Sequence, residues 1–162
     1  MPQLANARAE PAFLSGVALG SRPHVCAFFR DQDEEYRVLI PFIVEGIRRG
    51  EKVFHTINPR SLATHLERLQ AAGIHVRQAQ QSGQLEVRSW EEFQLREGHF
   101  DQGRLLSSIS GVLDQARSQG YPRTRFVADM DWVFEDRFGL QSFLSLEIVV
   151  NQMLLEHPDP VI

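Results

Sequence analysis

Apolar and polar positions alternate along this chain in blocks that predict strands and helices in turn. Residues 25–29 form a short, wholly apolar run, which is typical of a strand covered on both faces. The acidic stretch at 30–35 is expected to be a loop. Apolar residues then recur at helical spacing up to Gly50, which predicts an amphipathic helix, and a second strand is expected at 53–57. This half of the chain therefore predicts one strand–helix–strand unit.

The same alternation continues beyond that unit. Asn58 and Pro59 predict a helix start, because an N-cap residue is followed by proline at the first helical position. Residues 74–82 are expected to be a short strand or a turn. A third strand is expected at 84–89, where apolar and polar residues alternate. Residues 90–100 are expected to be a loop or a short helical turn.

Two long helices and one strand are expected in the last third of the chain. Asp101 is placed to cap the first helix, whose predicted inward face is Leu105, Ile109, Val112 and Ala116. A fourth strand is expected at 125–129, and a last helix at about 138–156. Strands that alternate with helices predict an α/β fold with a mostly parallel sheet flanked by helices.

The length of 162 residues predicts a single domain. Proline and glycine punctuate residues 1–22, which are expected to form a flexible arm with one helical turn around 12–19. The domain is expected to span residues 23–162.

Charge and composition limit the classes of function. The formal net charge is −4, and acids and bases are mixed along the chain, so direct nucleic-acid binding is not expected. The chain has no apolar run long enough for a membrane span and no secretory signal pattern, and Cys26 is its single cysteine. We therefore expect a cytoplasmic protein. The oligomeric state stays open.

Candidate ligand-binding residues follow the predicted strands, because ligands of open α/β sheets lie at the carboxyl ends of the strands. Arg30 follows the first strand, and Asp129, Asp131 and Trp132 follow the fourth. The two aspartates are open to two interpretations. Either they cap a loop and form salt bridges, or they hold a metal or an activated water.

A further pair of polar residues lies within the apolar stripe of the last predicted helix. Glu147 and Asn151 are four residues apart and therefore neighbours on one helix face. A carboxylate in such surroundings needs a partner or changes its pKa. Glu147 is expected either to pair with a buried arginine, with Asn151 holding a loop, or to line a ligand pocket or an interface together with Asn151.

No cofactor or metal is expected. No two histidines have the spacing of metal ligands on a helix, and none forms a zinc-type motif with Cys26, so a zinc site is not predicted. Cys26 is expected to be a small core residue of the first strand. No glycine-rich phosphate loop is present.

The order of several short motifs resembles the MEDS family, the methanogen/methylotroph, dichloromethane dehalogenase regulator sensory domain. The matching pieces lie between residues 22 and 160: HVCAFF, FIVEGIRRGEKV, GQLEV, Phe100 with Asp101, Met130 with Trp132, and Glu147 with Asn151. The family in turn resembles the RecA-like ATPase core without its phosphate loop. The resemblance implies a RecA-like three-layer fold and places Asp129 near the strand-end acid that assists magnesium in those ATPases.

The resemblance implies a non-catalytic sensory role. The domain would bind a small organic ligand and pass a change of state to a protein partner, a transcription regulator or a kinase. Two other classes of function stay open. One is a divergent nucleotide-dependent hydrolase that uses Asp129 and Asp131 with a metal, and the other is an assembly subunit without a ligand.

Overall fold

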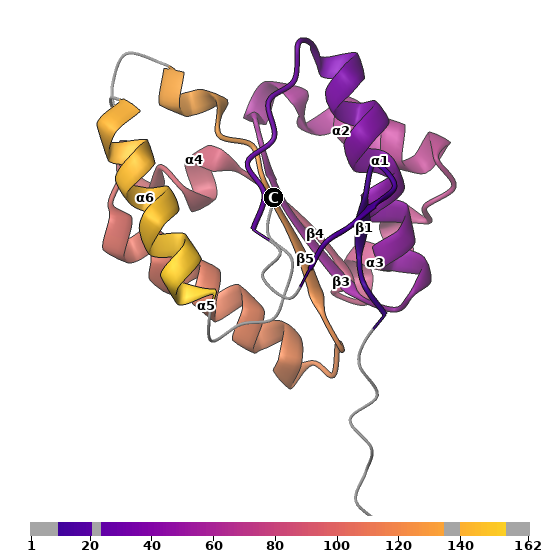
Figure 1. The fold of residues 1–162 in the computed structure, drawn as a ribbon. Helices are drawn as coiled ribbons and strands as arrows, with labels where there is room; N and C mark the ends of the chain where they lie inside the picture. The colour runs from indigo at the N-terminus through magenta and orange to yellow at the C-terminus, as the bar shows by residue number, and fades with distance from the viewer. Residues whose placement is uncertain (1–9, 21–23, 135–139, 155–162) are drawn as a thin grey trace, which may run out of the picture.

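A parallel sheet of three strands forms the centre of the fold. The computed structural model describes residues 10–20, 24–134 and 140–154, with side chains in the last segment from Leu144 onward. Strand β3 (Lys52–Ile57) lies between β4 (Leu85–Ser89) and β5 (Thr124–Ala128). Figure 1 shows the sheet in the middle of the molecule, with helices on both sides of it. Both pairings are parallel, and every residue of β3 is buried. The predicted α/β class and these three strands are confirmed.

The predicted first strand is wrong. Residues 25–29 are extended but belong to no strand, and only His24 makes an isolated bridge. The side chain of Phe28 is 80% exposed, and Cys26 is exposed as well, so Cys26 is not a core residue. An apolar run becomes a buried strand only where other elements cover both of its faces. Here the segment covers a cavity, which is described below.

Helix α1 (Gln32–Arg48) begins inside the stretch that was expected to be an acidic loop. The side chain of Asp31 accepts a hydrogen bond from the backbone N–H of Glu34 at 2.8 Å and caps the helix. The remaining acids occupy the first helical turn, where the positive end of the helix dipole stabilises negative charge. The four acidic groups therefore serve a helix start, and the loop prediction is wrong for 32–35.

Short helices connect the strands. The side chain of Asn58 accepts a hydrogen bond from the N–H of Arg60, which starts η1 (Pro59–Ser61) and then α2 (Leu62–Ala71), as predicted. Residues 76–81 form α3 (Val76–Gln81), so the expectation of a strand or turn there is wrong. Val76 and Ala79 are spaced for one helix face, and both pack against the core. The connection after β4 contains α4 (Trp90–Phe93) and η2 (Arg96–Gly98).

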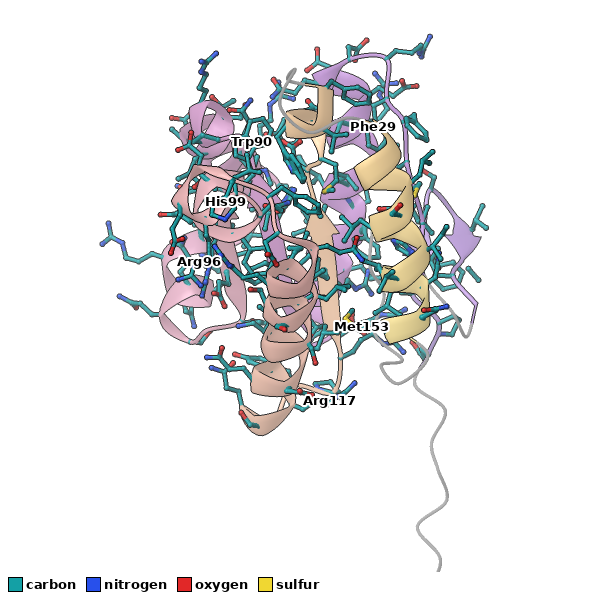
Figure 2. The ribbon with its side chains drawn as sticks, turned by 90° about the vertical axis from the view of Figure 1, so that its left-hand side faces the viewer. Phe29, Trp90, Arg96, His99, Arg117 and Met153 are labelled. Atoms are coloured by element: carbon teal, nitrogen blue, oxygen red, sulfur yellow. The ribbon has the colours of Figure 1, made fainter. Side chains whose placement is uncertain are left out.

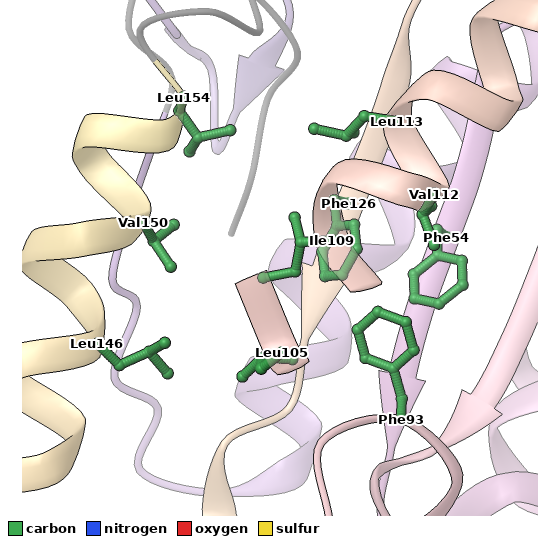
Figure 3. Close-up of a cluster of buried hydrophobic side chains, with 10 residues drawn as sticks. All are labelled: Phe54, Phe93, Leu105, Ile109, Val112, Leu113, Phe126, Leu146, Val150 and Leu154. Atoms are coloured by element: carbon green, nitrogen blue, oxygen red, sulfur yellow. The ribbon is translucent and has the colours of Figure 1, made fainter. Parts of the chain in front are cut away.

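Helices cover both faces of the sheet because side chains alternate along each strand. On one face, α5 (Gln102–Ser118), α4 and α6 (Leu140–Met153) pack over the sheet, and Figure 2 shows α5 and α6 in front of it. Asp101 caps α5, and its four predicted inward residues are buried, as expected. Figure 3 shows the resulting cluster: Phe54, Phe93, Leu105, Ile109, Val112, Leu113, Phe126, Leu146, Val150 and Leu154.

The opposite face of the sheet carries α1, α2 and α3, with a second buried cluster that includes Phe42, Val53, Leu69 and Val127. A small hairpin lies against α1 and is formed by β1 (Phe13–Leu14) and β2 (Val17–Ala18). Its two turn residues, Ser15 and Gly16, both have positive φ angles, as the tight hairpin turn requires. The helical turn expected there is therefore wrong, and the arm's first nine residues lie outside the described part.

A buried arginine links β5 to α1 and β3. Arg125 is fully buried, and its Nε donates to Glu51 Oε2 at 2.5 Å. Its Nη1 donates to the carbonyl oxygen of Phe42 at 2.7 Å and to Glu45 Oε2 at 2.8 Å. In the stretch FIVEGIRRGE, both glutamates thus pair with one guanidinium group, and the ring of Phe42 lies against it, with 4.6 Å between the ring centroid and Arg125 Cζ. These contacts give the motif a structural role, since they hold β5 against α1.

Candidate functional site

A cavity of about 530 Å³ lies at the carboxyl end of β5. The extended segment 24–31 forms one wall, the end of β5 with residues 129–131 forms another, and α1, α5 and α6 contribute side chains. Ligands of parallel α/β sheets bind at this edge, and the volume is that of a small-molecule pocket.

The inner wall of the cavity is apolar. It is formed by the edge of the first core cluster: Phe93, Leu105, Ile109, Phe126, Leu146 and Val150. Two further lining residues, Phe28 and Phe134, are 80% and 72% exposed. Large apolar side chains that remain exposed beside a cavity are typical of a site that receives an apolar molecule.

One end of the cavity is acidic. Asp129 Oδ2 accepts from the backbone N–H of Asn58 at 3.0 Å, and Oδ1 accepts from the N–H of Asp131 at 2.9 Å. Burial raises the pKa of Asp129. Burial, and then the charges of Asp129 and Asp131, raise the pKa of the lining residue Glu35 to about 7. The aspartates were predicted from the sequence, but Glu35 was not, since it lies in the first turn of a helix mistaken for a loop.

A second polar group lies where the segment 24–31 meets α6. The thiol of Cys26 donates to Glu147 Oε2 at 2.7 Å, and His24 Nε2 lies 3.4 Å from the same oxygen. His24 Nδ1 lies 3.0 Å from Asn151 Oδ1. Partial burial and the neighbouring carboxylate raise the pKa of the Cys26 thiol to about 12. Glu147 therefore faces a thiol and an imidazole instead of the buried arginine that was expected. The fully buried Arg125 pairs with Glu51 and Glu45.

The contacts of His24 and Cys26 with Glu147 were not predicted from the sequence. The available signal was the spacing of His24 and Cys26, because residues two apart on an extended segment project to the same side. Of the described residues, these three are the group whose ligand atoms all lie within 4.8 Å of one another and could hold a metal ion.

The remaining predicted site residues are dispersed. Arg30 lines the cavity, but its side chain is 82% exposed and forms an ion pair with Glu34 at 3.0 Å. Trp132 lies in η3 (Asp131–Phe134) and is buried against the ring of Phe100, with 5.3 Å between ring centroids. Asn151 reaches the cavity only through its contact with His24. The structure therefore brings Asp129 and Asp131 together at one end of the cavity, and Glu147 and Asn151 together at another wall. Whether any of these six residues contacts a ligand stays a prediction.

A parallel α/β domain with an apolar cavity at the carboxyl end of its sheet is typical of domains that bind small molecules. The chain belongs to the family described as MEDS, the MEthanogen/methylotroph, DcmR Sensory domain, whose model matches residues 23–162. The family resemblance of the sequence is thus confirmed.

One curated relative is the transcriptional repressor DcmR of Methylorubrum extorquens, which is 22% identical to this chain over 149 residues. The match covers 92% of this chain and 53% of the repressor, so the chain spans about half the length of this relative. No solved structure matches significantly. In the described parts of the chain, no helix is both long and apolar enough to cross a membrane.

Proposed function

We propose that this domain is a non-catalytic sensory module that binds a small, largely apolar organic molecule in the cavity below residues 24–31. Binding of this molecule changes the conformation of the domain, and a transcription regulator or a kinase in the cytoplasm responds to that change. The observation that carries the proposal is the cavity itself, with its apolar inner wall and its two exposed phenylalanines. The kinship with a transcriptional repressor supports the regulatory part.

The course of the chain supports a route for the signal. The cavity wall 24–31 ends at Asp31, the residue that caps α1. A ligand that displaces this wall therefore acts directly on the first turn of α1. Since residues 25–29 are held by no strand pairing, their displacement breaks no sheet hydrogen bonds. A movement of the cavity wall can thus reach α1 directly, because residues 24–31 are covalently continuous with its first turn.

We further propose that the fold is a RecA-like core that has lost its phosphate loop. The order β4-β3-β5 leaves the far edge of β5 without a partner among the described strands. Residues 24–29, which precede α1, would be the counterpart of the strand that leads into a phosphate loop. The positions that follow carry Asp31, Asp33, Glu34 and Glu35, whose charges repel phosphate.

The alternative of a nucleotide-dependent hydrolase has weaker support. Both carboxylate oxygens of Asp129 accept backbone N–H groups, which favours a capping role over metal binding. The acidic start of α1 disfavours a nucleoside triphosphate, because its carboxylates repel the negatively charged phosphate groups. An assembly subunit without a ligand remains the third class, and it predicts no binding in the experiment that follows.

Thermal unfolding with a panel of small halogenated and aliphatic compounds tests the proposal. A ligand at a hundredfold excess over its Kd stabilises the folded state by about 2.7 kcal/mol, which corresponds to a Tm increase of roughly 5–10 °C for a domain of this size. MgATP serves as the comparison compound. A Tm increase with MgATP alone would favour the hydrolase, and no increase with any compound would contradict the sensory proposal.

A variant that fills the cavity locates the binding. Ala27 lines the cavity from a segment without strand pairing, so Ala27→Trp is expected to fill the space without disturbing the sheet. The matched control is Ala63→Trp, at an exposed position of α2. Ligand-induced stabilisation should disappear in Ala27→Trp and persist in Ala63→Trp. Equal stabilisation of both variants would place the ligand elsewhere.

A further inference from the structure

Three groups of the kind that bind metals meet at one point of the cavity wall. His24 and Cys26 come from the extended segment, and Glu147 comes from α6, more than a hundred residues away in the sequence. One ligand atom of each lies within 4.8 Å of the others. An imidazole, a thiol and a carboxylate form a donor set that borderline cations such as Zn²⁺ prefer, whereas Mg²⁺ and Ca²⁺ prefer oxygen alone.

Hydrogen bonds determine which nitrogen of His24 is available. Asn151 Nδ2 donates to the backbone carbonyl oxygen of Glu147 at 3.0 Å, which turns the amide oxygen of Asn151 toward His24. That oxygen lies 3.0 Å from Nδ1 and can only accept a hydrogen bond, so this contact favours the tautomer with the proton on Nδ1. The lone pair of Nε2 then faces the Glu147 carboxylate at 3.4 Å. A cation or a proton placed between these two acceptors would be stabilised by both of them.

We propose that His24 Nε2, Cys26 Sγ and a Glu147 carboxylate oxygen bind a divalent cation of the Zn²⁺ type. Ligand atoms of a tetrahedral zinc site lie roughly 3.2–3.8 Å apart, given the usual zinc–ligand bond lengths. The distance between His24 Nε2 and Glu147 Oε2 already falls in this range. The 2.7 Å contact between the Cys26 thiol and Glu147 has to lengthen by about 1 Å, which rotation of an exposed cysteine on an unpaired segment allows.

Asn151 is the positioning residue of this site. Histidine ligands commonly donate their second N–H to an oxygen acceptor, which holds the ring in place and raises its basicity. Asn151 provides this acceptor, and its own amide is oriented by the helix backbone. Glu147 and Asn151 thus act together at the edge of the buried face of α6, which Leu146, Val150 and Leu154 form.

The proton balance of binding is simple. The cation replaces the thiol proton, which passes to solvent, and the thiol–carboxylate hydrogen bond gives way to a metal–sulfur and a metal–oxygen bond. Three protein ligands leave a fourth position of a tetrahedral site open. Because all three residues line the cavity, a water molecule or a ligand in the cavity can take that position. The metal site does not depend on the proposed organic ligand and is tested without it.

Cobalt(II) is a suitable probe, because its spectrum reports thiolate ligation and tetrahedral geometry. Chelator-treated, reduced protein is titrated with Co²⁺ and then with Zn²⁺. We expect a sulfur-to-cobalt charge-transfer band at one metal per chain, loss of the band on addition of Zn²⁺, and release of about one proton per metal. The band can arise only from Cys26, since the chain has no other cysteine. Size-exclusion chromatography at saturation distinguishes this site from a metal that bridges two chains.

Substitutions assign the ligands. Cys26→Ser should abolish the charge-transfer band, and His24→Gln and Glu147→Gln should each lower the affinity at least a hundredfold. Asn151→Ala should lower it by about 10- to 100-fold while keeping the band, as expected of a positioning residue. His99→Gln and Glu91→Gln alter exposed residues outside the cavity lining and should change nothing.

Three results would overturn the proposal. One is the absence of the band, in which case the three groups form only an ion pair and a hydrogen bond. Another is a band that survives both His24→Gln and Glu147→Gln. The third is a stoichiometry of one metal per two chains. Far-UV circular dichroism of each variant without metal verifies that it folds, and Asn151→Ala supplies the decisive affinity measurement if His24→Gln does not fold.

Discussion

The α-carbon of Gly46 lies against the side chain of Arg125. A β-carbon at position 46 would be 2.7 Å from Arg125 Cδ and 2.9 Å from its Nε. The guanidinium group cannot move aside, because it is fully buried and tied to Glu51, Glu45 and the backbone of Phe42. Gly46 of the FIVEGIRRGE motif is therefore required by the space that Arg125 occupies.

Gly46→Ala is accordingly expected to destabilise the domain. Overpacking of a buried site typically costs about 1–3 kcal/mol, which would lower the Tm by roughly 2–12 °C in a domain of this size. Gly111→Ala is the matched control, since Gly111 also lies within a helix but has open space around it. The control should be neutral or stabilising by up to about 1 kcal/mol. Urea unfolding measures both, and equal effects would contradict the close contact.

The two glutamates that pair with Arg125 are expected to differ in importance. The side chain of Glu51 is 7% exposed and that of Glu45 is 28% exposed. Removing Glu51 leaves a buried guanidinium without its closest partner, and such a loss costs about 3–5 kcal/mol. Water screens the Glu45 contact, so its removal should cost about 1 kcal/mol. Free energies of unfolding of Glu51→Ala and Glu45→Ala test this order, and a reversed order would contradict it.

His55 and His65 predict a loss of stability in mild acid. They lie 3.1 Å apart between Nδ1 and Nε2, and both are buried. Burial lowers the pKa of His65 to about 4, and burial together with the neighbouring histidine lowers the pKa of His55 well below its usual value. The unfolded chain binds these protons near pH 6.5, so stability falls as the pH drops below that value.

His65 alone accounts for a loss of up to about 3 kcal/mol between pH 6.5 and pH 4. Free energies of unfolding at about pH 7 and pH 5 measure the slope. His65→Gln should flatten this dependence, whereas His75→Gln, at an exposed position, should leave it as it is. An unchanged slope in His65→Gln would mean that the buried pair does not control acid stability.

Glu35 predicts a pH dependence of the opposite sign. Its pKa in the folded domain is about 7, above that of an exposed glutamate, so the folded state holds a proton that the unfolded chain releases. The stability from Glu35 is present below about pH 4.5 and is lost as the pH rises through 7. Glu35→Gln should therefore stabilise the domain by about 1–3 kcal/mol at pH 8 and by little at pH 5. Glu91→Gln is the exposed control, and an equal effect of both substitutions would contradict the raised pKa.

Local patterns of the sequence were sufficient for most of the helices and for three strands. The cap at Asp101, the start at Asn58 and the inward face of α5 depend on residues within a few positions of one another, so neighbours in the chain determine them. The alternation of strands and helices then predicts a parallel sheet, because the crossover connections leave few other arrangements. The prediction failed at 25–29, since an apolar run does not reveal whether another strand pairs with it.

The contacts that define the site required the tertiary structure. His24 and Cys26 meet Glu147 across more than a hundred residues. Outside the site, Arg125 likewise meets Glu45 and Glu51 over a long distance in the sequence. Such long-range contacts depend on which elements pack together and in which register. The local periodicity of the sequence determines neither the packing partners nor the register. The sequence by itself thus determined three strands, most of the helices, the α/β class and the family. The packing of segment 24–31 over β5 and α6 decided where the cavity lies and which polar groups face one another in it.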